Sequence, residues 1–174
     1  MPVLEPLVDI VPLAESSVLA RHYADRIRKS LADRSSRRSF QALKSTIFLV
    51  DFDSGEAITL RFDHGRLTLH DGAIGMPSVT FGGPLRALLS LDRVNWENLK
   101  QVALGRENAD PSLVDTDDRR SSPPPASTRR PNAPSRERVS MGEVLRLFRA
   151  GELKVYGLWR HPRTVARFLR LIRA

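Results

Sequence analysis

The chain has 174 residues, no cysteine and a hydrophobic fraction of 41%. This length favours one domain, and the lack of cysteine excludes disulfides and thiolate chemistry and fits a cytoplasmic location. The formal net charge of +8 is concentrated at the C-terminus, where residues 139–174 hold eight lysines and arginines against two acids. A basic segment of this kind can face nucleic acid, anionic lipid or an acidic protein.

The first residues are apolar, but they do not have the pattern of a secretory signal. They lack a basic leading region and are interrupted by Pro2, Pro6 and Pro12. No run in the chain approaches the roughly 20 apolar residues of a membrane span. We therefore expect an irregular N-terminus over residues 1–15, in a cytoplasmic protein that associates with the inner membrane surface at most peripherally.

A helix is expected next. Ser16 or Ser17 can cap it, and Leu19, Tyr23 and Ile27 recur every four residues up to about Leu31. This spacing places the apolar side chains on one face of the helix. Residues 33–39 are polar and basic, and we assign them no element.

Four short strands are predicted between residues 46 and 81. Apolar residues alternate with polar ones, as in Ile58, Leu60 and Phe62, so each strand has one apolar face. The connections at 53–56 and 63–66 contain glycine, which suits tight hairpin turns. A sheet with one apolar face must cover that face with helices or with a ligand.

Two further helices are expected after the strands. Pro84 opens one that carries Leu85, Leu88 and Leu89, and a second is expected from Val94 to Leu104. Residues 105–138 then contain six prolines, seven arginines and six acids, and very few aliphatic side chains. Such a segment cannot bury enough apolar surface to offset its ordering entropy. We interpret it as a disordered insert within a single domain that spans residues 1–174.

Ordered structure is expected to resume at Ser140, which can cap a helix that Gly151 ends. Residues 153–156 predict a fifth strand, and Pro162 opens a last helix. One side of that helix is apolar, with Val165, Phe168, Leu169 and Ile172. The other side carries arginines, and the candidates for membrane contact here are Trp159, Arg160, Arg163, Arg167 and Arg170. Docking on the sheet alone, added membrane contact and nucleic-acid contact all stay open.

The sequence offers little catalytic chemistry. The four histidines, at positions 22, 64, 70 and 161, are not paired at the spacing of metal ligands. The aspartates at 51, 53, 63 and 71 lie at strand ends, where turn formation explains them more simply than acid–base work. Nucleophile-elbow and phosphate-loop motifs are absent. We expect no catalytic residues, no metal and no cofactor.

Several segments resemble the sterol carrier protein type-two family of lipid-binding domains. They are Gly65-Arg66-Leu67, the strand Pro77–Phe81, the helix Leu85–Ser90 and above all Met141–Gly157, which ends in Gly-Glu-Leu-Lys-Val-Tyr-Gly. The resemblance covers roughly residues 40–92 and 139–172. Ser78 stands where the family usually has an acid, and the long insert has no counterpart.

The resemblance implies an α+β fold with a five-stranded, mostly antiparallel sheet and helices packed on one face. It also implies a hydrophobic tunnel between the sheet and the helices that holds a lipid. The candidate lining residues are Phe48, Phe52, Leu60, Phe62, Leu69, Phe81, Leu85, Leu88, Leu89, Leu147, Phe148, Val155, Leu158, Phe168 and Leu169. The alternative is that these side chains only pack on one another, because apolar residues usually form core.

The leading hypothesis is a non-enzymatic lipid carrier, or a protein that presents a lipid to an enzyme. Its partners would be a sterol-like, acyl or polyprenyl chain, an anionic membrane surface and an enzyme of lipid or quinone synthesis. A scaffold or accessory subunit of such an enzyme is the second hypothesis. A nucleic-acid-binding protein is the third, and we do not expect it because no recognition motif accompanies the basic residues.

Overall fold

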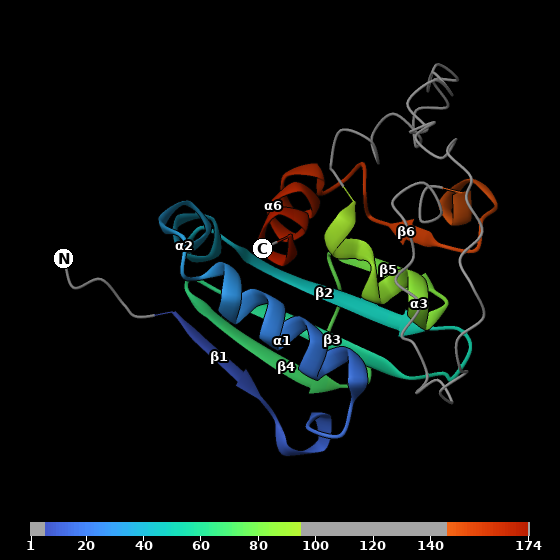
Figure 1. Ribbon diagram of the computed structural model, residues 1–174, viewed down its shortest axis with the longest axis horizontal. Coiled ribbons are helices and arrows are strands. Elements are labelled where there is room, and N and C mark those ends of the chain that lie inside the picture. Colours follow the sequence, from blue (N-terminus) through green and yellow to red (C-terminus); the bar gives the residue numbers. More distant parts are fainter. Residues whose placement is uncertain (1–5, 95–145, 174) are drawn as a thin grey trace, which may run out of the picture.

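The computed structural model describes residues 6–94 and 146–173. In this part of the chain a six-stranded sheet has the strand order β1-β4-β3-β2-β5-β6, and the helices lie on one of its faces (Figure 1). The strands are β1 Leu7–Ile10, β2 Lys44–Asp51, β3 Ala57–Asp63, β4 Arg66–Asp71, β5 Val79–Gly83 and β6 Lys154–Tyr156. The helices are α1 Val18–Ser30, α2 Arg34–Gln41, α3 Leu85–Leu89 and α6 Pro162–Ile172, with the 3-10 turns η1 Pro12–Ala14 and η2 Leu91–Arg93.

The sheet is mixed rather than purely antiparallel. β3 pairs antiparallel with β2 and β4, and β6 pairs antiparallel with β5. β1 lies parallel to β4, and β5 lies parallel to β2. The predicted α+β class with helices on one face is confirmed, and the described residues form six strands where five were expected.

The additional strand is β1, so the expectation of an irregular N-terminus is wrong for residues 7–14. Val8 and Ile10 pair with Leu67 and Leu69 of β4 and pack against the core. The flanking prolines are tolerated because β1 is an edge strand, where a missing N–H breaks no ladder. A strand of four residues is too short for the alternation to stand out in the sequence.

Helix α1 begins where the sequence predicts. The Ser17 hydroxyl oxygen accepts a hydrogen bond from the Ala20 N–H at 2.9 Å, which is a normal N-cap. The same hydroxyl donates to the Glu56 carboxylate, which also accepts from the Leu19 N–H at 3.3 Å. A carboxylate at this position is favoured by the helix dipole, so Glu56 ties the β2–β3 turn to the start of α1.

Helix α2 occupies the polar segment to which we assigned no element. The Asp33 carboxylate caps it by accepting from the Ser36 N–H at 2.8 Å. Only Ser36 and Phe40 are buried along it, and two positions four residues apart give too weak an apolar pattern to be recognised. Arg37 Nε donates to the Leu31 carbonyl at 2.5 Å, which closes the C-terminal end of α1.

Two turns have the predicted chemistry. His64 and Gly65 join β3 to β4 with φ values of 45° and 94°, which fits the two-residue hairpin turn that needs positive φ at both positions. The Asp51 carboxylate accepts from the Asp53 N–H at 3.0 Å and from the Ser54 N–H at 3.2 Å. This aspartate therefore stabilises its turn, as the sequence analysis expected.

Some predictions lie outside the described residues. These are most of the helix expected over residues 94–104, the insert at 105–138 and the helix cap at Ser140. The later elements are described, and Gly151, strand β6 and helix α6 lie where they were predicted.

We predict that Gly157→Ala is destabilising, because Gly157 joins β6 to α6 in a conformation that only glycine adopts easily. Its φ is +81°, and an added Cβ would lie 2.3 Å from the Ser78 carbonyl oxygen. We expect a loss of about 2–3 kcal/mol in the free energy of unfolding, measured by chemical denaturation.

Gly72→Ala is the matched control for this prediction. Gly72 has a φ of +67° but open space around the position of the new Cβ. The Gly72→Ala substitution should lower the free energy of unfolding by only about 1 kcal/mol, which is the backbone penalty alone. Equal losses for the two variants would contradict the proposed close contact at Gly157.

Candidate functional site

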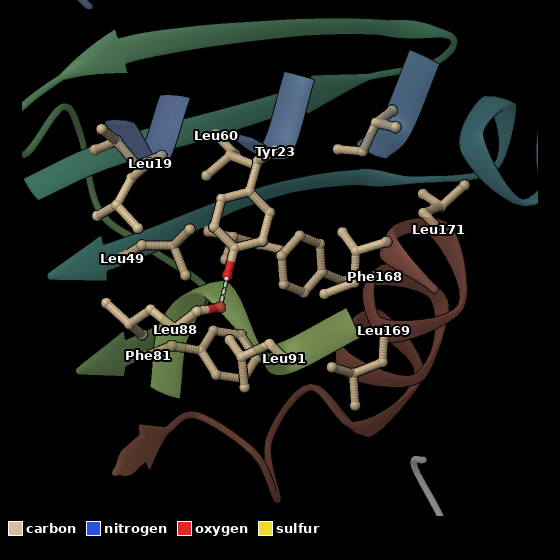
Figure 2. Packing of buried hydrophobic residues seen from close by; sticks show 14 of the residues in the cluster. Leu19, Tyr23, Leu49, Leu60, Phe81, Leu88, Leu91, Phe168, Leu169 and Leu171 are labelled. Atoms are coloured by element: carbon tan, nitrogen blue, oxygen red, sulfur yellow. Dashed lines mark hydrogen bonds between the residues drawn. The ribbon is translucent and has the colours of Figure 1, made fainter. Parts of the chain in front are cut away.

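The candidate site is the apolar layer between the sheet and the helices, which we call the sheet–helix layer. Leu49, Leu60 and Phe81 enter it from the sheet, Tyr23 from α1 and Phe168 from α6 (Figure 2). Each of these side chains is at most 1% exposed. Their positions follow from strand and helix periodicity, because every second strand residue and one stripe of each helix face the layer.

Phe168 lies at the centre of an aromatic cluster in this layer. Its ring centroid is 5.6 Å from that of Phe81, 5.9 Å from Tyr23 and 6.4 Å from Phe62. Phe62 in turn makes an edge-to-face contact with Phe40 of α2 at 6.0 Å. Contacts in this distance range stabilise beyond simple area burial. The last helix is therefore joined to α1, β3 and β5 through one ring.

Tyr23 and Ser45 bring hydroxyl groups to this layer. The Tyr23 hydroxyl donates a hydrogen bond to the Leu88 carbonyl of α3 at 2.6 Å (Figure 2). Burial, and to a lesser extent the charge of Asp92, raises the pKa of this phenol above its usual range, so it stays protonated and donates. Ser45 has the same strand parity as the buried Ile47, so it lies on the helix side of β2.

The Ser45 hydroxyl is the unusual one. The side chain is only 8% exposed, and its oxygen has no hydrogen-bond partner in the structure described here. Ser45 pairs with Phe62 of β3, so the hydroxyl lies beside the aromatic cluster. A buried hydroxyl without a partner costs free energy that a bound oxygen atom can recover.

The structure brings most of the predicted lining residues together. Nine of them belong to the buried core, namely Leu60, Phe62, Leu69, Phe81, Leu88, Leu147, Leu158, Phe168 and Leu169. Four more pack against it and are partly buried, namely Leu85, Leu89, Phe148 and Val155. Their arrangement forms the apolar layer, while their role in binding a ligand stays a prediction.

Two predicted lining residues are not in this layer. Phe48 alternates with the buried Ile47 and Leu49, so it points to the helix-free face of the sheet. Phe52 is 50% exposed, and its ring lies against Gly82 on that same face. Grouping residues by apolar character, without strand parity, caused this error.

The predicted membrane-contact residues are all exposed. Arg160, Arg163, Arg167 and Arg170 lie at the surface, and Trp159 is 57% exposed. The opposite side of α6 is buried, with Val165 and Ile172 beside the residues already named. Arg167 Nη1 also donates to the Ala42 carbonyl at the end of α2, at 3.0 Å.

A separate open depression of about 270 Å³ lies at the ends of β2 and β5. Its lining residues are Phe52, Asp53, Pro84, Arg86 and Glu152. It lies outside the sheet–helix layer, and its charges of both signs do not match a lipid chain. We therefore do not assign the candidate site to it.

The sequence analysis missed Tyr23, Ser45 and Leu49 as part of the layer. Tyr23 was recognised as a core position of α1, but nothing local shows that α6 packs against it.

Among residues 6–94 and 146–173, no cluster of three or more histidine, aspartate or glutamate side chains could hold a metal. No helix within these ranges is long and apolar enough to cross a membrane.

Comparisons with known proteins give structural matches only. No protein-family model and no curated protein matches the sequence. The structure is similar to that of a UbiJ-SCP2 ubiquinone synthesis protein, with a TM-score of 0.51 and 12% identity over 89% of this chain and 92% of that one.

Two further matches have lower TM-scores and carry no argument here. A crystal structure of sterol carrier protein 2 gives a TM-score of 0.38 at 11% identity, over 88% of this chain and 94% of the other. The solution structure of a conserved hypothetical protein from Thermus thermophilus gives 0.37 at 12% identity, over 91% and 86%.

At these identities the similarity concerns the fold. The resemblance found in the sequence is confirmed at that level, because the structural match extends over 89% of this chain and 92% of the UbiJ-SCP2 protein. The protein has the α+β fold of the sterol carrier protein type-two domains, with β1 as a strand beyond the expected five.

Proposed function

We propose that this protein is a non-enzymatic lipid carrier, or an accessory protein that presents a lipid to an enzyme. The ligand would be a sterol-like, acyl or polyprenyl chain held in the sheet–helix layer. The observation that carries this proposal is the composition of that layer, which is aromatic and aliphatic with few polar groups, among them the hydroxyls of Tyr23 and Ser45. Lipid sites have this chemistry, with many apolar side chains and few polar groups that orient the ligand.

The ring of Phe168 fills the centre of the layer, so a chain must displace it to bind there. Removing a buried phenylalanine lowers the stability by about 3–5 kcal/mol, and each methylene group that a ligand buries contributes about 0.8 kcal/mol of binding free energy. A chain that buries about five methylene groups therefore offsets the loss. Acyl and polyprenyl chains are long enough to do so.

Helix α6 is the element that can move to admit the chain. It is connected to β6 through the loop that begins at Gly157, whose φ is +81°. A side-chain hydrogen bond from Arg167 to the Ala42 carbonyl joins the exposed side of α6 to the end of α2. Its remaining attachment is apolar packing, which a bound chain replaces with contacts of the same kind.

A role beside a quinone-synthesis enzyme is the more specific form of this proposal. The UbiJ-SCP2 protein that shares the fold is described as a ubiquinone synthesis protein. A polyprenyl quinone precursor combines a long apolar chain with ring oxygens. The sheet–helix layer offers apolar walls for the chain and the unpartnered Ser45 hydroxyl for an oxygen.

Native mass spectrometry of the freshly purified full-length protein tests the proposal directly. We expect a bound lipid, which organic extraction releases and identifies. If the protein carries no lipid and also fails to bind added fatty acids and isoprenoid quinones, the carrier function is wrong. The lipid's identity separates quinone precursors from acyl chains and sterol-like ligands.

We predict that Phe168→Leu tightens lipid binding several-fold, because less packing must be displaced from the layer. The same change should lower the free energy of unfolding by about 1–2 kcal/mol. Titration with a fluorescent fatty acid measures the affinity, and chemical denaturation measures the stability.

Phe48→Leu is the matched control, since Phe48 is an aromatic residue of the helix-free face. It should leave the affinity unchanged. A loss of binding in Phe48→Leu with no change in Phe168→Leu would place the ligand on the helix-free face instead.

We predict that Ser45→Ala separates stability from ligand selectivity. Removing an unpartnered buried hydroxyl should stabilise the free protein by about 1 kcal/mol. It should weaken binding of ligands with a polar head more than binding of a plain hydrocarbon chain. Competition between a fatty acid and the alkane of the same length measures this difference, and equal effects on both would contradict a contact between Ser45 and the head group.

A further inference from the structure

The helices α2 and α6 lie side by side at one corner of the fold, on the same face of the sheet (Figure 1). The hydrogen bond from Arg167 to the Ala42 carbonyl joins the middle of α6 to the end of α2. We call the exposed side of this pair the basic corner. Its exposed arginines are Arg34, Arg37 and Arg38 of α2 and Arg163, Arg167 and Arg170 of α6, flanked by Arg160 and Arg173.

The basic corner has almost no charge compensation. Neither helix contains an acidic residue, and the described residues place no ion pair on their arginines. The nearest acid in sequence, Asp33, caps α2 and accepts from the Ser35 hydroxyl and the Ser36 N–H, so one carboxylate there stands against eight arginines. No ion pair of the described residues offsets these positive charges, so their field adds up at this surface.

The apolar side of α6 cannot supply the binding, because it is already used in the core. Val165, Phe168 and Leu171 are fully buried against the rest of the fold. An amphipathic helix that inserts into a bilayer must free its apolar face for the lipid. In this fold that step would remove α6 from the sheet, so the exposed arginines act by surface contact alone.

We propose that the basic corner docks the protein on an anionic bilayer surface through contacts between arginine and lipid phosphate groups. Arginine forms paired hydrogen bonds with phosphate, and each cation near an anionic bilayer adds about fivefold to the partition coefficient. Trp159, 57% exposed just before α6, is placed to enter the headgroup region as interfacial tryptophans do. This docking does not depend on the carrier function, because it needs no lipid inside the fold.

A bilayer fits the basic corner better than nucleic acid does. The exposed arginines are spread over two helices that lie side by side, whereas the major groove of a duplex admits a single helix. Stacking of single-stranded bases needs several aromatic platforms, and the exposed positions of α2 and α6 carry no aromatic side chain. The source of the phosphate is therefore a lipid headgroup.

Vesicle flotation of the full-length protein tests the proposal. The probes are vesicles of phosphatidylcholine with and without phosphatidylglycerol, at low salt and at ~1 M salt, where the Debye length falls to about 3 Å. We expect binding only to the vesicles with phosphatidylglycerol, and loss of that binding at high salt. Equal binding to neutral vesicles, or binding that persists at high salt, would overturn the proposal.

Paired substitutions locate the contact. Arg163→Gln with Arg170→Gln on α6, and Arg34→Gln with Arg38→Gln on α2, should each lower the partition coefficient on the order of twentyfold. The control pair is Arg61→Gln with Arg86→Gln, which removes the same charge from exposed positions away from the corner. A control pair that weakens binding as much as the others would show that only net charge matters, and would refute the docking site.

Two further readouts complete the test. In a Trp96→Phe background, the emission of Trp159 should shift to the blue on anionic vesicles, and an unchanged spectrum of the bound protein contradicts the proposed orientation.

A duplex oligonucleotide should bind more weakly than the anionic vesicles at the same salt. Tighter binding to the oligonucleotide, lost in the α2 and α6 variants, would assign the basic corner to nucleic acid and overturn the membrane proposal.

Discussion

The packing of Phe168 among three other rings is the interaction on which the arrangement of this fold depends. The ring comes from the last helix, and its neighbours Tyr23, Phe62 and Phe81 come from α1, β3 and β5. These contacts join residues that are more than 80 positions apart in sequence, so they close the layer only when the whole sheet is in place. A contact of such long range forms late in folding, because the chain must first lose the entropy of closing the long loop between the two residues.

The same ring links stability to the proposed function. A core that is complete without ligand is stable, but it must open for a chain to enter, and the opening costs about what one buried phenylalanine contributes. Packing on one side of α6 and charge on the other give the helix two separate tasks. In the two proposals, the apolar side controls the opening of the layer to a chain, and the arginine side docks the protein on a bilayer. Because the two sides do not share residues, changes on one need not disturb the other.

Most of the architecture follows from local sequence signals, and the exceptions have physical reasons. The Ser17 cap, the His64-Gly65 turn and the α6 boundary at Pro162 depend on single residue types with a strong local preference. Strand β1 and helix α2 were missed because tertiary packing, rather than propensity, holds such short segments. The candidate site was predictable as a set of apolar residues. The side of the sheet that each one faces required strand parity, which Phe48 illustrates.

The polar groups of the layer were the least predictable part, and they bear most on selectivity. A wall of leucine and phenylalanine distinguishes chains weakly, since one methylene group is worth only about 0.8 kcal/mol. Discrimination by head group needs a buried donor or acceptor that is left unpaired by the wrong ligand. Tyr23 already donates to Leu88, so its hydroxyl is committed to joining α1 with α3. The Ser45 hydroxyl forms no hydrogen bond in the described structure. Its strand position places it beside the ring of Phe62, near the corner where α2 and α6 meet. An amphiphile with its oxygen at Ser45 would therefore lie with its head toward the arginines and its chain along the sheet, the orientation in which a lipid would arrive from a bilayer bound to that corner.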